Sequence, residues 1–345
     1  MPTNRLKTLA LTTAITAGCS LSHQTREAGA DPGPEIDEAT TDQPQELGRV
    51  RWERDFDAAM ERARKENKPA LVLFDEVPGC HTVLSYGKNV LSHPLIVEAI
   101  EDHFVPVVVY NNRLVGRDRE LLAEFEEPSW NNPVVRIITP DRRPLAPRLA
   151  DDITLAATAD TLISALAAHK VTPPPWLKAL ADEARARKHG TRRATYAMSC
   201  FWQGEADLGA LEGVVETNTG FAQGREVVEV HFDPRAIHPE AFDQRAQTIG
   251  DPLQANAAFK PSPKDDKHAL ARTPWRHVPM TPTQAARANA AIARGLDPAD
   301  LLSPGQLRLA ARIRARPDAG WPTHLGKGDL EAAFDAANAV YRATH

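Results

Sequence analysis

The sequence predicts two folded domains, the first of α/β class and the second of α+β class. The chain has 345 residues, which is too long for one ordinary domain and long enough for two hydrophobic cores. Between residues 49 and 170, apolar patterns of helical and strand type alternate, as in an α/β fold with a central sheet. Pro173 to Pro175 then break this pattern, and a second group of strand-like segments begins near Ala194.

The first 48 residues differ in composition from the rest. Arg5 and Lys7 lie at the start of an apolar run, Leu6 to Ala17, that is too short to span a bilayer. We predict an export signal over residues 1–18, and the small residues before Cys19 resemble a bacterial lipoprotein cleavage box. Lipid on Cys19 would place the protein in the periplasm at the cell envelope; a plain signal peptide or a chance cysteine is the alternative. Residues 19–48, rich in Asp, Glu, Pro, Gly and Thr, are expected to form a disordered tether.

The first domain, residues 49–170, is predicted from its alternating periodicity. Trp52 to Lys65 carries apolar residues at helical spacing, and Pro69 introduces a strand-like run. The segments that follow alternate in the same way. The expected strands are 70–74, 104–110 and 134–138, and the expected helices are 52–65, a segment around 95–100, 118–126 and 158–169.

A single cysteine follows the first strand of this domain. It ends the sequence Val77-Pro78-Gly79-Cys80, and Pro133 precedes the third strand. This order resembles the thioredoxin family, whose usual Cys-x-x-Cys motif here keeps only its second thiol; a similar Val-Pro-Gly-Cys motif occurs in thioredoxin-like proteins of bacteria. The resemblance implies that Pro133 is cis and faces the active cysteine. Cys80 could form a mixed disulfide, act as a peroxidatic thiol, serve a neighbour, or be a remnant of a lost motif.

Residues 171–190 are predicted to link the domains through a basic helix, Trp176 to Lys188. Lysines and arginines cluster from Lys178 to Arg193, and we interpret them as a solvated helix face. The formal charge of −5, with no basic patch interleaved with aromatic residues, gives no indication of a nucleic-acid partner.

The second domain, residues 191–345, begins with a strand that stops at Ser199-Cys200. Phe201, Trp202 and Glu205 then open a helix. A thiol at this position faces unpaired backbone N–H groups and the positive end of the helix dipole, which favours the thiolate. The two aromatic rings after it can form an apolar pocket, so the pattern suits a nucleophile that acts on a methyl-bearing centre. A buried structural thiol is the alternative.

This stretch resembles the A-type peptide methionine sulfoxide reductases. The resemblance rests on Cys200-Phe201-Trp202, on the turn from Thr219 to Gly224, and on Glu226 to Pro234, and it covers about a third of the chain. It implies an α/β sandwich in which Cys200 attacks the sulfoxide sulfur and becomes a sulfenic acid, while Phe201 and Trp202 hold the substrate methyl.

Departures from the family pattern concern proton donors. The segment that supplies the family's glutamate acid is missing before Arg225-Glu226, and the tyrosine of the substrate-binding turn is Phe221. Where the family has a further pocket tyrosine, the segment Ala271 to Arg276 contains none. Protonation of the sulfoxide oxygen is therefore expected to come from Glu205 or Glu226, or to be largely missing.

The rest of the second domain is expected to consist of a long loop and several helices. The loop runs from Asp251 to Met280, and the last two helices are expected to cover a sheet. The helices are 239–249, 284–294, 306–316 and 330–342.

The cysteines and histidines limit the chemistry. Three cysteines do not fit a disulfide framework, and with lipid on Cys19 only Cys80 and Cys200 remain, one in each domain. Since no other cysteine lies in the domain of Cys200, Cys80 is the expected resolving partner, and an external dithiol would reduce the disulfide. The twelve histidines lack metal-ligand spacing, so neither a metal nor another cofactor is expected.

The expected function is thiol-dependent reduction of methionine S-sulfoxide, free or in oxidised proteins, by an exported enzyme that meets the membrane only through its lipid anchor. Two alternatives belong to other classes. A reductase-like domain without turnover would bind methionine-containing or oxidised segments, or support assembly at the envelope. A thiol peroxidase or other redox protein would act through Cys80.

Overall fold

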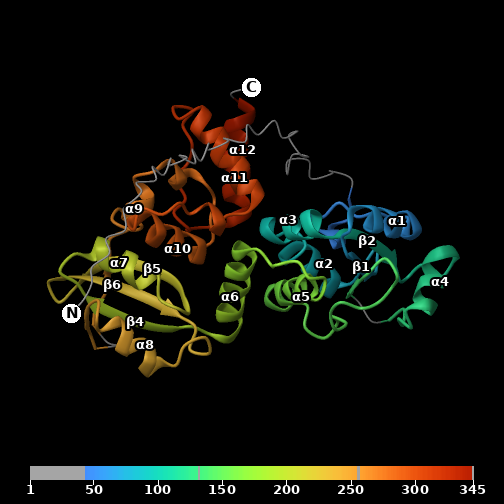
Figure 1. Ribbon diagram of the computed structural model, residues 1–345, viewed down its shortest axis with the longest axis horizontal. Coiled ribbons are helices and arrows are strands. Elements are labelled where there is room, and N and C mark those ends of the chain that lie inside the picture. Colours follow the sequence, from blue (N-terminus) through green and yellow to red (C-terminus); the bar gives the residue numbers. More distant parts are fainter. Residues whose placement is uncertain (1–42, 131–132, 255–256, 344–345) are drawn as a thin grey trace, which may run out of the picture. The chain divides into compact units, whose positions relative to one another are not determined.

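The computed structural model describes residues 43–130, 133–254 and 257–343. It contains two sheets, one in each expected domain, and both are combined with helices (Figure 1). The predicted α/β and α+β fold class is confirmed. In these ranges no helix is both long and apolar enough to cross a membrane.

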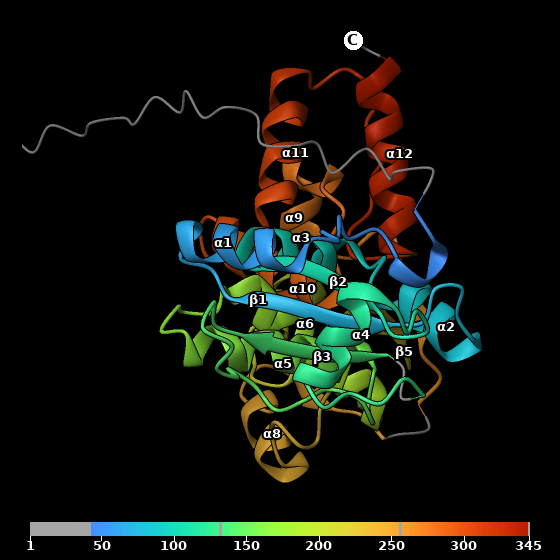
Figure 2. The same ribbon diagram turned by 90° about the vertical axis from the view of Figure 1, so that its right-hand side faces the viewer.

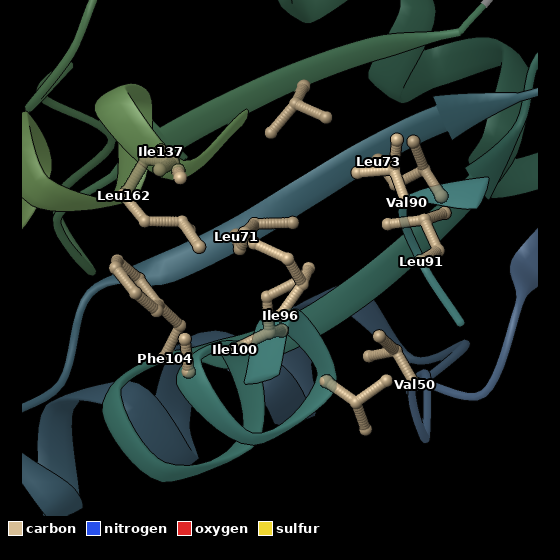
Figure 3. Close-up of a cluster of buried hydrophobic side chains, with 14 of the residues drawn as sticks. Val50, Leu71, Leu73, Val90, Leu91, Ile96, Ile100, Phe104, Ile137 and Leu162 are labelled. Atoms are coloured by element: carbon tan, nitrogen blue, oxygen red, sulfur yellow. The ribbon is translucent and has the colours of Figure 1, made fainter. Parts of the chain in front are cut away.

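The first domain is built on a three-stranded sheet. Its centre is β1 (Ala70–Asp75), which pairs in parallel with β2 (Val105–Tyr110) and antiparallel with β3 (Val134–Ile138) (Figure 2). Every residue of β1 is buried, as its continuous apolar run predicts. Alternate side chains face opposite sides of the sheet, so Leu71 and Leu73 join one hydrophobic cluster (Figure 3) and Val72 and Phe74 join another.

Four helices of the first domain overlap their expected ranges, and a fifth, directly after Cys80, had no expected bounds. Local signals fix them: Asp55 accepts a hydrogen bond from Ala58 N–H at the start of the first helix, and Thr154 accepts one from Ala157 N–H at the start of the last. The helices are α1 (Phe56–Glu66), α2 (His81–Asn89), α3 (Pro94–His103), α4 (Gly116–Glu124) and α5 (Leu155–Ala168).

The end of the expected tether is folded, which corrects one boundary. Residues 43–48 were expected to belong to a disordered segment, yet Gln45–Leu47 forms the 3-10 helix η1 with Glu46 and Leu47 buried. The Gln43 amide donates to the backbone oxygens of Gly48 and Val50. Leu47 packs in the hydrophobic cluster of the first domain. The polar composition of residues 19–48 as a whole did not indicate this contact. Residues 1–42, which include the predicted signal and Cys19, lie outside the described residues.

The predicted linker contains a helix that is part of the core. α6 (Pro175–His189) has its basic residues on the solvated face, as interpreted from the sequence. Its opposite face is apolar, and Trp176, Leu177 and Leu180 belong to the same hydrophobic cluster as Leu71. The Glu183 carboxylate also accepts a hydrogen bond from Thr283 N–H of the second domain. α6 is therefore a packed element and not a free connection.

The second domain is built on an antiparallel sheet in the order β7-β4-β6-β5-β8. The three long strands are β4 (Arg192–Ala197), β5 (Val214–Ala222) and β6 (Arg225–Phe232), and the two short edge strands are β7 (Asp251–Pro252) and β8 (Lys260–Pro261). The strands β5 and β6 form a hairpin through Gln223 and Gly224, both at positive φ. The helices α7 (Phe201–Gly209), α8 (Pro239–Ala246), α9 (His268–Ala271) and α10 (Pro282–Ala293) complete this part.

The last two helices do not cover a sheet. α11 (Pro304–Ala315) and α12 (Leu330–Ala343) contribute Leu309, Ile313 and Phe334 to a hydrophobic cluster whose buried members come only from residues 270–337. The amphipathic pattern identified both helices correctly. It could not identify their partners, because an apolar face packs equally well on a helix or on a sheet. The short 3-10 helices η2 (Pro274–His277) and η3 (Ala299–Leu301) lie in the same region of the chain.

Candidate active site

Cys200 lies at the open end of a helix. It is the N-cap residue of α7, its backbone is extended, and its side chain is exposed. The strand before it is fixed because Met198 N–H donates to Glu226 O and because the Met198 side chain packs against Gly204 and Gly250. A Cβ at Gly204 would lie 2.5 Å from Met198 Sδ, so a larger residue there would have to displace the Met198 side chain. The exposed position meets the main requirement of the nucleophile interpretation.

Three aromatic rings surround the start of α7. Phe201 is only 5% exposed, whereas Trp202 and Phe221 are 39% and 41% exposed. The Phe201 ring lies 6.0 Å from the Trp202 ring and 5.5 Å from the Phe221 ring, between centroids. The predicted substrate-binding residues therefore come together beside Cys200, and two of them present ring surface to solvent.

His268 is a fourth ring at this site, and sequence reasoning missed it. Its imidazole stacks on the Trp202 indole, with centroids 3.9 Å apart and planes 11° from parallel. Burial lowers the pKa of His268, and the positive charge of Arg272 lowers it further, against an opposing effect of Asp265. His268 lies 66 residues after Trp202 in a segment expected to be loop, so no spacing pattern could connect the two rings.

Glu226 places a carboxylate at the turn that carries Cys200. Its Oε2 accepts a hydrogen bond of 2.9 Å from Phe201 N–H. The pairing of β4 with β6 produces this contact, because Ala197 stands opposite Val227 in the register. Glu226 is half-buried. Of the two candidate acids, Glu226 is thus the one with a hydrogen bond to the residue that follows Cys200.

Glu205 has a different environment. Its side chain is fully buried, and Oε1 lies 3.0 Å from Lys267 Nζ and accepts a 3.1 Å hydrogen bond from Thr217 Oγ1. Oε2 accepts a 2.6 Å hydrogen bond from Lys267 N–H. Burial raises the pKa of Glu205, while the nearby Lys267 ammonium acts in the opposite direction. Both oxygens are occupied within the core, so these contacts do not support the expected role of Glu205 as the proton donor.

Cys80 lies at the start of a helix in the first domain. It is the N-cap residue of α2 and is exposed, and hydrogen bonds from the backbone of Val83 and Thr82 lower the pKa of its thiol. The preceding turn is tied down by Glu46, whose Oε1 accepts a 2.8 Å hydrogen bond from Gly79 N–H. Both Cys80 and Cys200 are free thiols.

Asp75 is a further unusual group next to this turn. It is fully buried at the end of β1, and neither carboxyl oxygen has a hydrogen-bond partner among the described residues. Burial raises the pKa of Asp75 to about 8. A weak signal for Asp75 was present in the sequence, because it directly continues a strand in which every other residue is apolar.

Two further expectations concern Pro133 and metals. Pro133 precedes β3 and is buried, but the bond between Asn132 and Pro133 lies outside the described residues. The cis peptide bond recorded in the described part is Val77-Pro78. Within the same part, no group of three or more His, Cys, Asp or Glu side chains has a geometry that could hold a metal ion.

Two comparisons with known proteins bear on the fold and on the chemistry. Residues 51–140 match the family model described as thioredoxin-like, so the first domain is thioredoxin-like. The peptide methionine sulfoxide reductase MsrA of Geobacter metallireducens is 32% identical over 81 residues, which cover 19% of this chain and 50% of that protein. The chain therefore spans about half the length of this relative, and the similarity supports a redox assignment without extending to the whole relative.

Proposed function

We propose that this protein is a thiol-dependent oxidoreductase that reduces methionine S-sulfoxide, free or in oxidised proteins. The observation that carries the proposal is the exposed Cys200 thiol at the start of α7, beside a set of aromatic rings. A methyl sulfoxide combines an apolar methyl group with a strongly polar oxygen, so an aromatic wall and a proton donor at one thiol suit it. The partial similarity to a peptide methionine sulfoxide reductase supports the same substrate class.

In the proposed reaction, Cys200 Sγ attacks the sulfoxide sulfur while the oxygen is protonated. The oxygen then passes to the cysteine, so one thiol and one methyl sulfoxide give one sulfenic acid and one methyl thioether. Glu226 is the proposed proton donor because its carboxyl group is held at Phe201 N–H and remains half-buried. Phe201, Trp202 and Phe221 form the apolar wall for the methyl group.

Cys80 is the proposed resolving thiol. It would attack the Cys200 sulfenic acid, forming a Cys80–Cys200 disulfide and releasing water, and an external dithiol of thioredoxin type would then reduce the disulfide. The exposure of both thiols and the lowered pKa of Cys80 support this step. No metal or organic cofactor takes part in the proposed cycle.

Location at the bacterial cell envelope belongs to the same proposal. It rests on the export signal over residues 1–18 and on lipid at Cys19, with oxidised envelope proteins as substrates and the lipid anchor as the contact with the membrane.

The test is turnover of a methionine S-sulfoxide peptide with dithiothreitol as reductant. Wild-type protein should reduce it, and Cys200→Ser should abolish reduction because no nucleophile remains. Glu226→Gln should lower kcat by roughly a hundredfold or more, since the oxygen loses its proton donor. Glu212→Gln, which changes an exposed glutamate paired with Arg245, should leave kcat unchanged. Failure of the wild-type protein to turn over any methionine S-sulfoxide would favour the binding or assembly role.

A second candidate function is peroxide reduction by Cys80. The exposed thiol and its lowered pKa favour it, because the thiolate is the form that attacks peroxide. Peroxide consumption that survives Cys200→Ser and disappears in Cys80→Ser would establish this function; equal consumption by wild type and Cys80→Ser would exclude it.

A further inference from the structure

The segment from Ser262 to His268 is held by an unusual number of buried polar contacts. Asp266 Oδ1 accepts hydrogen bonds from Thr219 N–H at 2.7 Å and from Thr219 Oγ1 at 2.8 Å, and Lys327 pairs with its other oxygen. Lys267 Nζ donates to Thr217 O at 2.5 Å as well as pairing with Glu205. Side chains from β5 and α7 thus fix two consecutive residues, Asp266 and Lys267.

Burying the Glu205–Lys267 ion pair carries a desolvation penalty, so the pair contributes little net stability. The Lys267 side chain is 3% exposed and that of Glu205 is fully buried, so both charges lose their hydration. Well-packed apolar residues commonly serve stability as well as a buried ion pair does. The ion pair fixes the position of the backbone at Lys267, because both the side chain and the backbone N–H of this residue bond to Glu205. The next residue is His268.

The His268 ring lies against Trp202, the residue two positions after Cys200. It covers one face of the Trp202 indole and is partly exposed, and its ring nitrogens have no hydrogen bond recorded with any described residue. Burial and the charge of Arg272 lower the pKa of His268, which favours the neutral imidazole, in which one nitrogen donates and one accepts. A polar ring beside apolar aromatic side chains suits a ligand that carries both an apolar group and a polar oxygen.

We propose that His268 is a substrate-binding residue that donates its ring N–H to the sulfoxide oxygen, and that Glu205 and Lys267 are the positioning residues that hold it on Trp202. The inference rests on the proposed function and names one further contact in the same site. It also explains how a site with Phe221 and no tyrosine at residues 271–276 supplies a donor for the oxygen in addition to Glu226.

The test separates the oxygen contact from the aromatic wall. In the full chain carrying Cys200→Ser, binding of N-acetyl-methionine-S-sulfoxide amide and of the corresponding thioether is measured by calorimetry. His268→Phe keeps a ring on Trp202 but removes the N–H, so the sulfoxide should bind roughly three- to tenfold more weakly while thioether binding stays within twofold. His238→Phe, at an exposed histidine before α8, should change neither affinity.

The positioning role is tested with a neutral replacement of the ion pair. The double variant Glu205→Gln/Lys267→Met avoids leaving one buried charge alone. It should show the same selective loss for the sulfoxide, and adding His268→Phe should cause little further loss, because all three changes act through one contact. A merely structural role would weaken both ligands equally and would add to the effect of His268→Phe.

The outcomes distinguish this inference from the proposed function. An unchanged ratio of sulfoxide to thioether affinity in His268→Phe, in a protein that turns over sulfoxide when Cys200 is present, overturns the inference alone. Absence of any sulfoxide binding in the Cys200→Ser chain contradicts the proposed function and the inference together.

Discussion

At the scale of single residues, Asp75 is a carboxyl group that is fully buried at the end of β1. A fully buried carboxyl group without hydrogen-bond partners costs several kcal/mol when ionised, so it holds its proton instead. Its pKa of about 8, against an ordinary value of 3.8, reflects this. Groups with such shifts cluster at functional sites, and Asp75 stands five residues before Cys80.

The shift predicts how stability depends on pH. Between about pH 4 and pH 8 the folded state keeps the Asp75 proton that the unfolded state has released, so stability falls as pH rises, by about 1.4 kcal/mol per pH unit. Asp75→Asn cannot ionise and should remove this slope. Between pH 5 and pH 8, the free energy of unfolding measured in urea should fall by about 4 kcal/mol less in the variant than in wild type.

The comparison between the two proteins isolates Asp75. Glu98, whose pKa burial raises to about 7, contributes a slope of the same sign in both proteins. Glu212→Gln, at an exposed glutamate of the second domain, serves as control and should keep the wild-type slope between pH 5 and pH 8. Parallel stability curves for wild type and Asp75→Asn would show that the carboxyl group is not buried in neutral form.

At the scale of elements, the sequence predicted most helices and strands because periodicity is a local signal. The strand β3 has the expected bounds, and α6 and α12 differ from expectation by one residue at each end or less. The short strands β7 and β8 and the helix η1 were missed, because two or three residues carry no period. Partners of the last helices were missed because packing is not a local property.

The site was only partly predictable for the same reason. Cys200, Phe201 and Trp202 are consecutive, so one motif identified them, and the hairpin turn identified Phe221. Glu226 reaches Phe201 through strand pairing, and His268 reaches Trp202 through a loop; both contacts need the folded register. Glu205 stood one turn and a half into the right helix, and only the folded structure shows that its carboxylate is paired with the buried Lys267.

The buried ion pair makes a prediction about α7 and the loop that packs on it. Lys267→Met leaves the Glu205 carboxylate buried without its cation and should lower the free energy of unfolding by about 3–5 kcal/mol. Adding Glu205→Gln removes the uncompensated charge and should recover a large part of that loss. Urea unfolding followed by circular dichroism measures both.

Lys264→Met is the matched control, because Lys264 is an exposed lysine of the same loop. Its free energy of unfolding should stay within about 0.5 kcal/mol of wild type. If Lys267→Met were as mild as this control, Lys267 would be solvated in solution and the loop would not be fixed by Glu205.

At the scale of the whole molecule, the question is how two single-thiol sites could share one redox cycle. Neither domain holds a second cysteine, so each thiol needs a partner from elsewhere. Where the fold lets the two thiols of one chain meet, their reaction does not depend on protein concentration, whereas a reaction between two chains does. The proposed relay therefore favours a link within one chain over a link between chains.

The proposed relay predicts how the yield of the Cys80–Cys200 disulfide depends on protein concentration. Wild-type protein treated with methionine S-sulfoxide in the absence of reductant should yield a Cys80–Cys200 linked peptide. The fraction of protein linked in this way should be the same at protein concentrations of about 1 and about 50 µM, because both thiols belong to one molecule. A mixture of Cys80→Ser and Cys200→Ser chains has the same two thiols on separate molecules, so it should form little covalent dimer in the same time. Mass spectrometry and non-reducing gels measure the two products. Efficient dimer formation in the mixture would show that the disulfide forms between two chains. Recovery of Cys200 only as sulfenic acid, or as a mixed disulfide with an external thiol, would show that Cys80 takes no part in the cycle.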